Sequence, residues 1–140
     1  MRPVRDESGR RYLLLEESDG SSHVRDPETG EQRSVDSDTL EPVEGESPLA
    51  VAARAVPGDV RRLLTAVPDE RALGLLVELD ERGPLAVRTL LGAYDCCESD
   101  LHGLLAEFRV AGLVAEREVH GERGYGLTDE GREALDAVRG

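Results

Sequence analysis

The spacing of apolar residues divides the chain into two parts. In residues 1–47 the apolar residues are few and stand in short runs between turn-forming segments such as Asp6-Glu7-Ser8-Gly9 and Asp26-Pro27-Glu28-Thr29-Gly30. Proline fixes φ and glycine accepts positive φ, so both segments favour turns. Residues 11–16 form the strongest strand candidate. We therefore predict a small antiparallel β meander of about three to five strands at residues 1–47.

From Pro48 onward, leucine, alanine and valine dominate and recur at helical spacing. Ser47 is a suitable N-cap for a helix at residues 49–56, which Pro57 ends, and Pro68 ends a second helix at residues 59–67. We interpret residues 48–68 as connecting or dimerisation helices.

Residues 69–140 have a more specific pattern. The helix that ends near residue 111 places Leu101, Leu104, Leu105 and Phe108 at positions i, i+3, i+4 and i+7, which predicts one buried face. In chain order we predict a helix at 69–82 capped by Asp69, an extended link at 85–87, a helix at 88–94, a tight turn at 95–97, a helix at 98–111, strands at 115–119 and 123–127, and a last helix capped by Thr128.

Two motifs carry a family resemblance. They are Leu104-Leu105-x-x-Phe108-x-x-x-Gly112-Leu113-Val114 and Tyr125-Gly126-Leu127-Thr128-x-x-Gly131-Arg132-x-x-Leu135. They resemble the end of the recognition helix and the junction between wing and last helix in winged helix-turn-helix regulators of the MarR, PadR and ArsR kind. The resemblance implies an α+β fold, with a small N-terminal antiparallel β module followed by a winged helix-turn-helix domain at residues 69–140. The β module is loosely similar to SH3-like or open-barrel modules.

The same resemblance implies a DNA-binding transcriptional regulator whose helix at residues 98–111 lies in the major groove. The candidate DNA-binding residues are Arg88, Ser99, His102, Gly103, Ala106, Arg117 and Arg123. The helix carries none of the usual base-reading side chains on its outer face, and Glu98 and Asp100 would repel phosphates. The alternative is therefore a protein–protein interaction or adaptor module without specific DNA binding.

A third hypothesis concerns the adjacent cysteines. Cys97 is expected at a helix N-terminus, where a thiolate is stabilised, so it is a candidate redox sensor. Metal binding is a further alternative, but we predict no metal site because good ligand spacing is lacking. We find no glycine-rich phosphate loop and no nucleophile elbow. The chain is therefore expected to be neither an enzyme nor a cofactor-binding protein.

The acidic net charge of the chain is only weak evidence against nucleic-acid binding. The chain of 140 residues has a formal net charge of −13, and it contains no lysine, isoleucine or asparagine. This composition resembles that of proteins from extremely halophilic archaea, the alternative being an acidic protein from a GC-rich mesophile. Residues 1–47 have 6 arginines against 13 acidic residues, and residues 48–140 have 11 against 17. The acidic excess is thus spread along the chain, as a solubility adaptation would be.

Four expectations concern partners and location. No apolar run approaches the ~18 residues of a membrane span, and the N-terminus has no export signal, so we expect a cytoplasmic protein. The helices at 49–56 and 59–67, together with Leu135 and Val138, are candidates for a homodimer interface. Double-stranded DNA is the expected ligand of the winged helix, and the β module would sense a ligand or recruit a protein partner.

Overall fold

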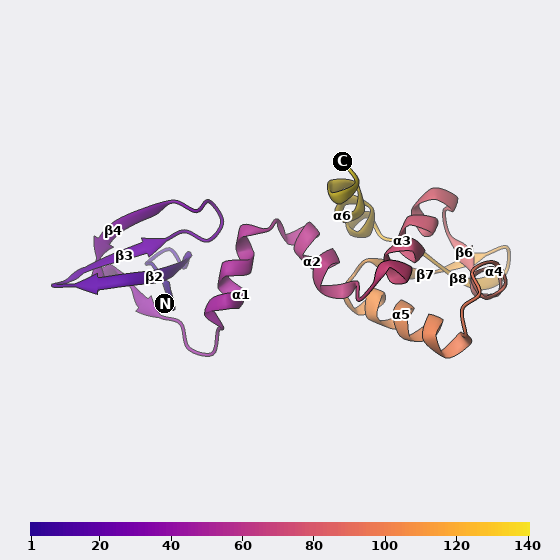
Figure 1. Ribbon diagram of the computed structural model, residues 1–140, viewed down its shortest axis with the longest axis horizontal. Coiled ribbons are helices and arrows are strands. Elements are labelled where there is room, and N and C mark those ends of the chain that lie inside the picture. Colours follow the sequence, from indigo (N-terminus) through magenta and orange to yellow (C-terminus); the bar gives the residue numbers. More distant parts are fainter. The chain divides into compact units, whose positions relative to one another are not determined.

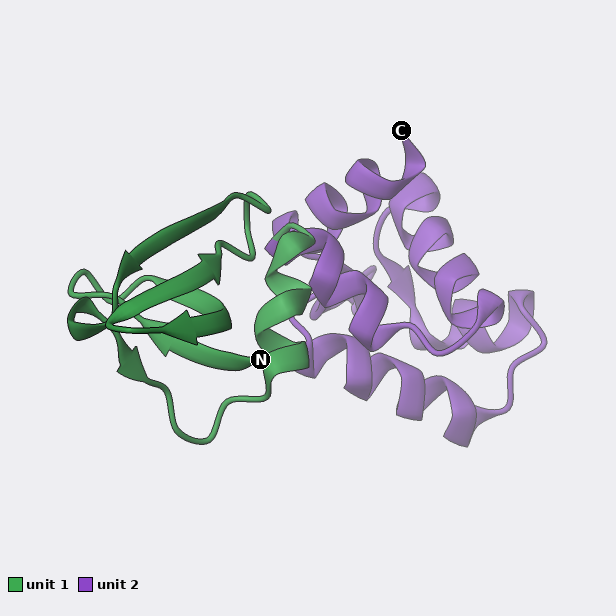
Figure 2. Ribbon diagram, turned by 60° about the vertical axis from the view of Figure 1, so that its left-hand side comes forward, with its two compact units in different colours: residues 1–57 green, residues 58–140 purple.

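The computed structural model describes residues 1–140, and the chain forms two compact units. Unit 1 comprises residues 1–57 and unit 2 comprises residues 58–140 (Figure 2). The expected α+β fold, with an antiparallel β module followed by a winged helix, is confirmed. The boundary lies within the predicted connecting segment at 48–68. No helix has both the length and the apolar character required to cross a membrane.

Unit 1 is built on one antiparallel sheet with the strand order β4-β3-β2-β1-β5 (Figure 1). A 3-10 turn precedes the last strand. The elements in chain order are β1 (Arg2–Arg5), β2 (Arg11–Ser18), β3 (Ser21–Arg25), β4 (Gln32–Asp36), the 3-10 turn η1 (Ser37–Thr39), β5 (Glu41–Pro42), α1 (Pro48–Ala52) and the 3-10 turn η2 (Ala53–Ala55).

The sheet of unit 1 buries side chains on both faces. One face forms a small cluster of Val4, Tyr12, Leu14 and Val24, with Val35 and Leu40 packed against it. On the other face Leu13 is fully buried, and α1 lies against β1 and β2 with Val51 buried. Alternation of side chains along a strand explains why three consecutive apolar residues of β2 serve two faces.

The predicted cap of α1 is confirmed, and the helix predicted at residues 49–56 is divided between α1 and η2. The Ser47 hydroxyl accepts hydrogen bonds from the N–H groups of Leu49 and Ala50 at 3.2 and 3.4 Å. The α-helix ends at Ala52 and η2 extends the helical segment to Ala55, where it stops because Val56 is extended before Pro57. A residue that precedes proline is sterically pushed out of the helical region.

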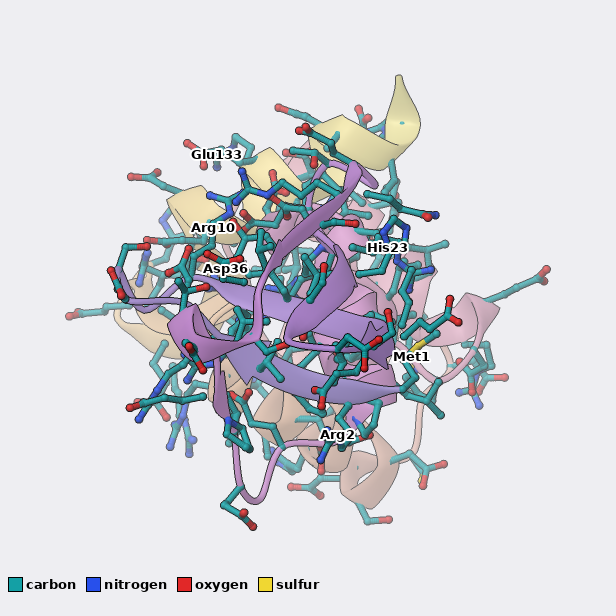
Figure 3. All side chains as sticks on the ribbon, turned by 90° about the vertical axis from the view of Figure 1, so that its left-hand side faces the viewer. Met1, Arg2, Arg10, His23, Asp36 and Glu133 are labelled. Carbon is teal, nitrogen blue, oxygen red and sulfur yellow. The ribbon has the colours of Figure 1, made fainter.

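An ion pair between Arg10 and Asp26 ties the β1–β2 turn to the β3–β4 turn (Arg10 is labelled in Figure 3). Burial of Asp26 raises the pKa of its carboxyl. The hydrogen bonds from Arg10 and from the backbone N–H groups of Glu28 and Thr29, together with the Arg10 charge, outweigh burial and hold that pKa below its usual value.

We expect unit 1 to lose stability in acid because of this carboxyl. A carboxyl whose pKa is lower in the folded state adds to the free energy of unfolding. This contribution is fully present above the pKa of the unfolded chain, which is about 4. That stability is lost as the pH falls through the lower, folded value. Chemical denaturation of the full chain between neutral and acid pH measures this dependence, and Asp26→Asn should flatten it. An equal pH dependence in that variant would contradict the assignment.

Unit 2 is a winged helix, with three helices, a β-hairpin and terminal helices around one core. Its sheet has the order β6-β8-β7. The elements are α2 (Gly58–Ala66), α3 (Glu70–Arg82), β6 (Leu85–Ala86), α4 (Val87–Ala93), α5 (Glu98–Val110), β7 (Val114–Val119), β8 (Glu122–Leu127) and α6 (Asp129–Arg139). All lie within about two residues of the predicted ranges.

Caps and glycines fix the ends of these helices. The Asp69 carboxylate accepts from Ala72 N–H at 2.9 Å, and the Thr128 hydroxyl accepts from Gly131 N–H at 2.9 Å, as predicted. Gly112 leaves α5 with φ of 79°, which glycine adopts at least cost. The buried face of α5 is Leu101, Leu105 and Phe108, whereas Leu104 is only half-buried.

Candidate nucleic-acid interface

The helix-turn-helix consists of α4, a four-residue connection from Tyr94 to Cys97, and α5. Asp95 takes a positive φ of 49° in this connection, which makes the turn tight. The N-cap of α5 is Cys97, whose side chain makes no capping hydrogen bond. Glu98 and Asp100 lie in the first turn, where the helix dipole favours acidic residues. These two carboxylates therefore stabilise the start of α5, although they would repel the phosphates of a DNA duplex bound to this helix.

The outer face of α5 presents the predicted residues to solvent. Ser99, Gly103 and Ala106 are exposed, and His102 is half-exposed with its Nε2 atom 3.6 Å from Glu98 Oε1. Small side chains give this part of the helix a low profile, so its backbone can approach a groove closely. Of these four residues, only Ser99 and His102 have polar side-chain atoms.

The wing and the C-terminal end of α5 meet at the carboxylate of Glu116 on β7. This carboxylate accepts from Arg109 Nη1 at 2.8 Å and from Arg123 Nη2 at 2.7 Å. Arg123 also donates to the Tyr125 hydroxyl at 2.8 Å, and its guanidinium lies 5.7 Å from the centre of that ring. The Tyr125 hydroxyl and Glu116 both raise the pKa of Arg123. Two arginines thus share one carboxylate, which leaves this cluster with one net positive charge.

The other two candidate arginines differ in how they are held. Arg117 donates from Nη1 to the Glu116 carbonyl oxygen at 3.0 Å and forms no ion pair. Arg88 has its Nε atom 3.4 Å from Glu122 Oε1, but its side chain is 87% exposed. Exposed ion pairs are worth at most about 1 kcal/mol, so phosphate groups can compete for these guanidinium groups.

Sequence reasoning did not include Arg109 among the site residues. It is the basic residue in the last turn of α5, and the structure brings it beside Arg123 through Glu116. No local pattern marks this contact, because it depends on the approach of β7 to the end of the helix. The alternation of Arg117 and Arg123 with acidic residues along the wing is the nearest signal.

The cysteines lie at the start of the same helix. Cys97 is exposed, with its Sγ atom 3.5 Å from Ser99 Oγ, and Cys96 is half-buried with its Sγ atom 4.0 Å from Arg71 Nη2. Both thiols are free. Residues 1–140 contain no group of histidine, cysteine and acidic side chains arranged to hold a metal ion.

A model of a family of unknown function, DUF7346, matches residues 1–139. The chain belongs to this family. The match includes both units, so the β module is as much part of the DUF7346 pattern as the winged helix. No curated protein matches the chain.

Among solved structures, the transcriptional regulator HlyU from Vibrio vulnificus CMCP6 is similar to this DUF7346 member. The two are 29% identical with a TM-score of 0.47, over 56% of this chain and 81% of the other. The winged-helix assignment depends on the element order and sheet pairing of unit 2.

Proposed function

We propose that this protein is a DNA-binding transcriptional regulator of the winged helix-turn-helix type. The observation that supports this best is the group of basic side chains where α5 meets the wing. Arg109 and Arg123 share the Glu116 carboxylate there, and Arg117 on the same hairpin has no ion pair. This arrangement supplies positive charge beside an exposed helix in a chain with a net charge of −13.

In this proposal, α5 contacts the bases and the wing contacts the phosphates. With α5 in the major groove, Ser99 and His102 approach base edges while Arg117 and Arg123 on the wing contact the phosphate backbone. Arg88 at the start of α4 supplies another phosphate contact. Because few side chains can read bases directly, most of the affinity for DNA comes from contacts with its phosphates, and this affinity falls as the salt concentration rises. Selectivity then depends largely on the shape of the duplex.

The first test removes single phosphate contacts. Arg117→Ala and Arg123→Ala should each weaken binding to a labelled duplex several-fold for every sequence tested, and lower the salt slope by about 1. Fluorescence anisotropy at a series of KCl concentrations measures both effects. Arg139→Ala on α6 is the matched control, since it removes the same charge from a side chain paired with Asp80 and Glu81. Equal losses in the control and the wing variants would count against this interface.

A second candidate function is a protein-interaction module that uses the same surface. The acidic first turn of α5 and the paired state of Arg88, Arg109 and Arg123 favour it. Glu116→Gln separates the two functions, because it releases two guanidinium groups for phosphate. A DNA-binding surface should gain affinity several-fold and a steeper salt slope. An unchanged affinity for DNA, together with capture of one stoichiometric protein partner, would favour the interaction module.

Thiol sensing through Cys97 is the third hypothesis. It requires that oxidation of the exposed thiol alters DNA binding, since Cys97 lies at the N-terminus of α5. Anisotropy titrations before and after peroxide treatment, with Cys97→Ser as the control, test it. Identical behaviour of both proteins would remove the hypothesis.

We also propose a cytoplasmic homodimer from a halophilic source. Leu135 is buried in the core of unit 2, so it cannot form the interface as expected. Leu64 on α2 and Val138 on α6 are 62% and 45% exposed, and α2 packs against α6. Sedimentation equilibrium of the wild type and Leu64→Glu in molar KCl tests the dimer. A monomeric wild type would overturn it.

A further inference from the structure

Unit 1 contains a pocket of about 310 Å³ on the core-facing side of its sheet, near the β1–β2 turn and η1. Its floor consists of apolar surface from Tyr12, Val24, Val35 and Leu40. Its remaining wall includes the charged residues Asp6, Glu7 and Arg33. The volume lies at the lower end of the range of roughly 300–1,000 Å³ that is usual for small-ligand sites.

Arg33 is unusual in where it points. In the β3–β4 register it is opposite Val24, and it is two residues from Val35 on the same strand, so its side chain lies on the core face. Its Nη2 atom donates to the Tyr12 hydroxyl at 2.7 Å, and its guanidinium lies 5.4 Å from the Tyr12 ring centre.

Arg33 also lacks the carboxylate partner that its neighbours have. Arg5, Arg10 and Arg11 each form an ion pair within unit 1. Arg33 forms none, and its side chain is exposed, so a ligand carboxylate can reach its guanidinium. Tyr12 fixes the position of this guanidinium, and the remaining N–H groups are available to a ligand carboxylate.

The acidic part of the wall offers carboxylates to a positively charged group of a ligand. The Oδ1 atom of Asp6 accepts from the N–H and hydroxyl of Ser8 and from the N–H of Arg10, which fixes the carboxylate in the turn. The Ser8 hydroxyl is the main cause that lowers the pKa of Asp6, so this carboxyl is ionised at neutral pH. The Oδ2 atom of Asp6 and the carboxylate of Glu7 accept no hydrogen bond from the protein, and the charge of Arg33 also lowers the pKa of Asp6.

These charges select a class of ligand. A simple anion would be repelled by Asp6 and Glu7, and a simple cation would leave the Arg33 guanidinium without an anionic partner. A zwitterion satisfies both parts of the wall, and an aliphatic side chain would cover the apolar floor. We propose that this pocket binds a free α-amino acid with an aliphatic side chain, its carboxylate on Arg33 and its ammonium on Asp6 and Glu7. The site does not depend on whether unit 2 binds DNA.

Arg33 also has a simpler explanation. Strand β4 is at the edge of the sheet, and an inward-pointing charge on an edge strand hinders pairing with another chain. That role requires no ligand. The two explanations therefore differ in whether the wild-type protein binds an amino acid at all.

Calorimetric titration of the full chain with L-leucine tests the proposal, with isocaproate and isoamylamine as analogues that lack the ammonium and the carboxylate. L-Leucine should bind, and each analogue should bind at least about tenfold more weakly. Arg33→Met should reduce leucine affinity by at least about tenfold, and Glu7→Gln should reduce it several-fold. Arg2→Met, on β1 outside the pocket, should leave it unchanged.

If Arg33→Met fails to fold, as judged by circular dichroism, Arg33→Gln serves as the second variant. Absence of leucine binding to the wild type would overturn the proposal and leave Arg33 as a guard against edge pairing. Equal binding of either analogue, or undiminished binding by the folded Arg33 variant, would overturn it as well.

Discussion

Replacing Phe108 with alanine should lower the free energy of unfolding of unit 2 by about 3–5 kcal/mol. Phe108 is the only phenylalanine of the chain and is completely buried. It lies on the inner face of α5 with Leu101 and Leu105, so its ring joins this helix to the core of unit 2. Its removal leaves a cavity that the surrounding helices can only partly fill.

Urea titration followed by circular dichroism measures this loss, since most helical residues belong to unit 2. Phe108→Leu is the conservative control and should cost less than about 1.5 kcal/mol. A loss below about 1 kcal/mol for Phe108→Ala would show that this side chain is not central to the core. DNA binding should weaken in parallel with unfolding, because α5 would lose its support.

Gly131→Ala should destabilise unit 2 by about 1–3 kcal/mol for a different reason. A Cβ atom at Gly131 would lie 2.2 Å from the carbonyl oxygen of Leu113, which is backbone and cannot move aside alone. The same carbonyl accepts from Thr128 N–H at 3.0 Å, so α6 would have to shift at its capped end. The glycine of the Thr128-x-x-Gly131 motif is therefore required by close packing.

Gly74→Ala on α3 is the matched control, because a Cβ atom there meets nothing within 4 Å. Replacing an exposed helical glycine with alanine should stabilise the protein by up to about 1 kcal/mol. The two alanine substitutions should therefore have opposite signs in the same urea titration. If the Gly131→Ala protein were as stable as the Gly74→Ala protein, the close packing of α6 on the Leu113 backbone before β7 would be contradicted.

The sequence predicted the elements of unit 2 well because their ends carry local chemical signals. Asp69 and Thr128 cap the helices that follow them, and Gly112 supplies the positive φ at the end of α5. The apolar spacing of α5 also identified its buried face, except that Leu104 lies at the margin. Such signals act over a few residues, which is the range that sequence patterns cover.

Features that depend on distant residues were not predicted. The pairing of β5 with β1 joins residues far apart in the chain, and nothing near Pro42 indicates its partner. The ion pairs of Arg109 and Arg123 with Glu116 likewise depend on how α5 and the wing meet. The pocket beside Arg33 is also formed by separate segments, since it needs Tyr12 from β2 and the acidic β1–β2 turn.

If the protein regulates transcription as proposed, α5 and the wing of unit 2 contact DNA. Backbone amide chemical shifts, recorded as a short duplex is added to the labelled full chain, test it most directly. We expect shifts that concentrate in residues 98–110 and 114–127, which include Arg109, Arg117 and Arg123. These shifts should disappear as KCl concentration rises. No shifts at any salt concentration that keeps the chain folded, or shifts confined to residues 1–57, would contradict it.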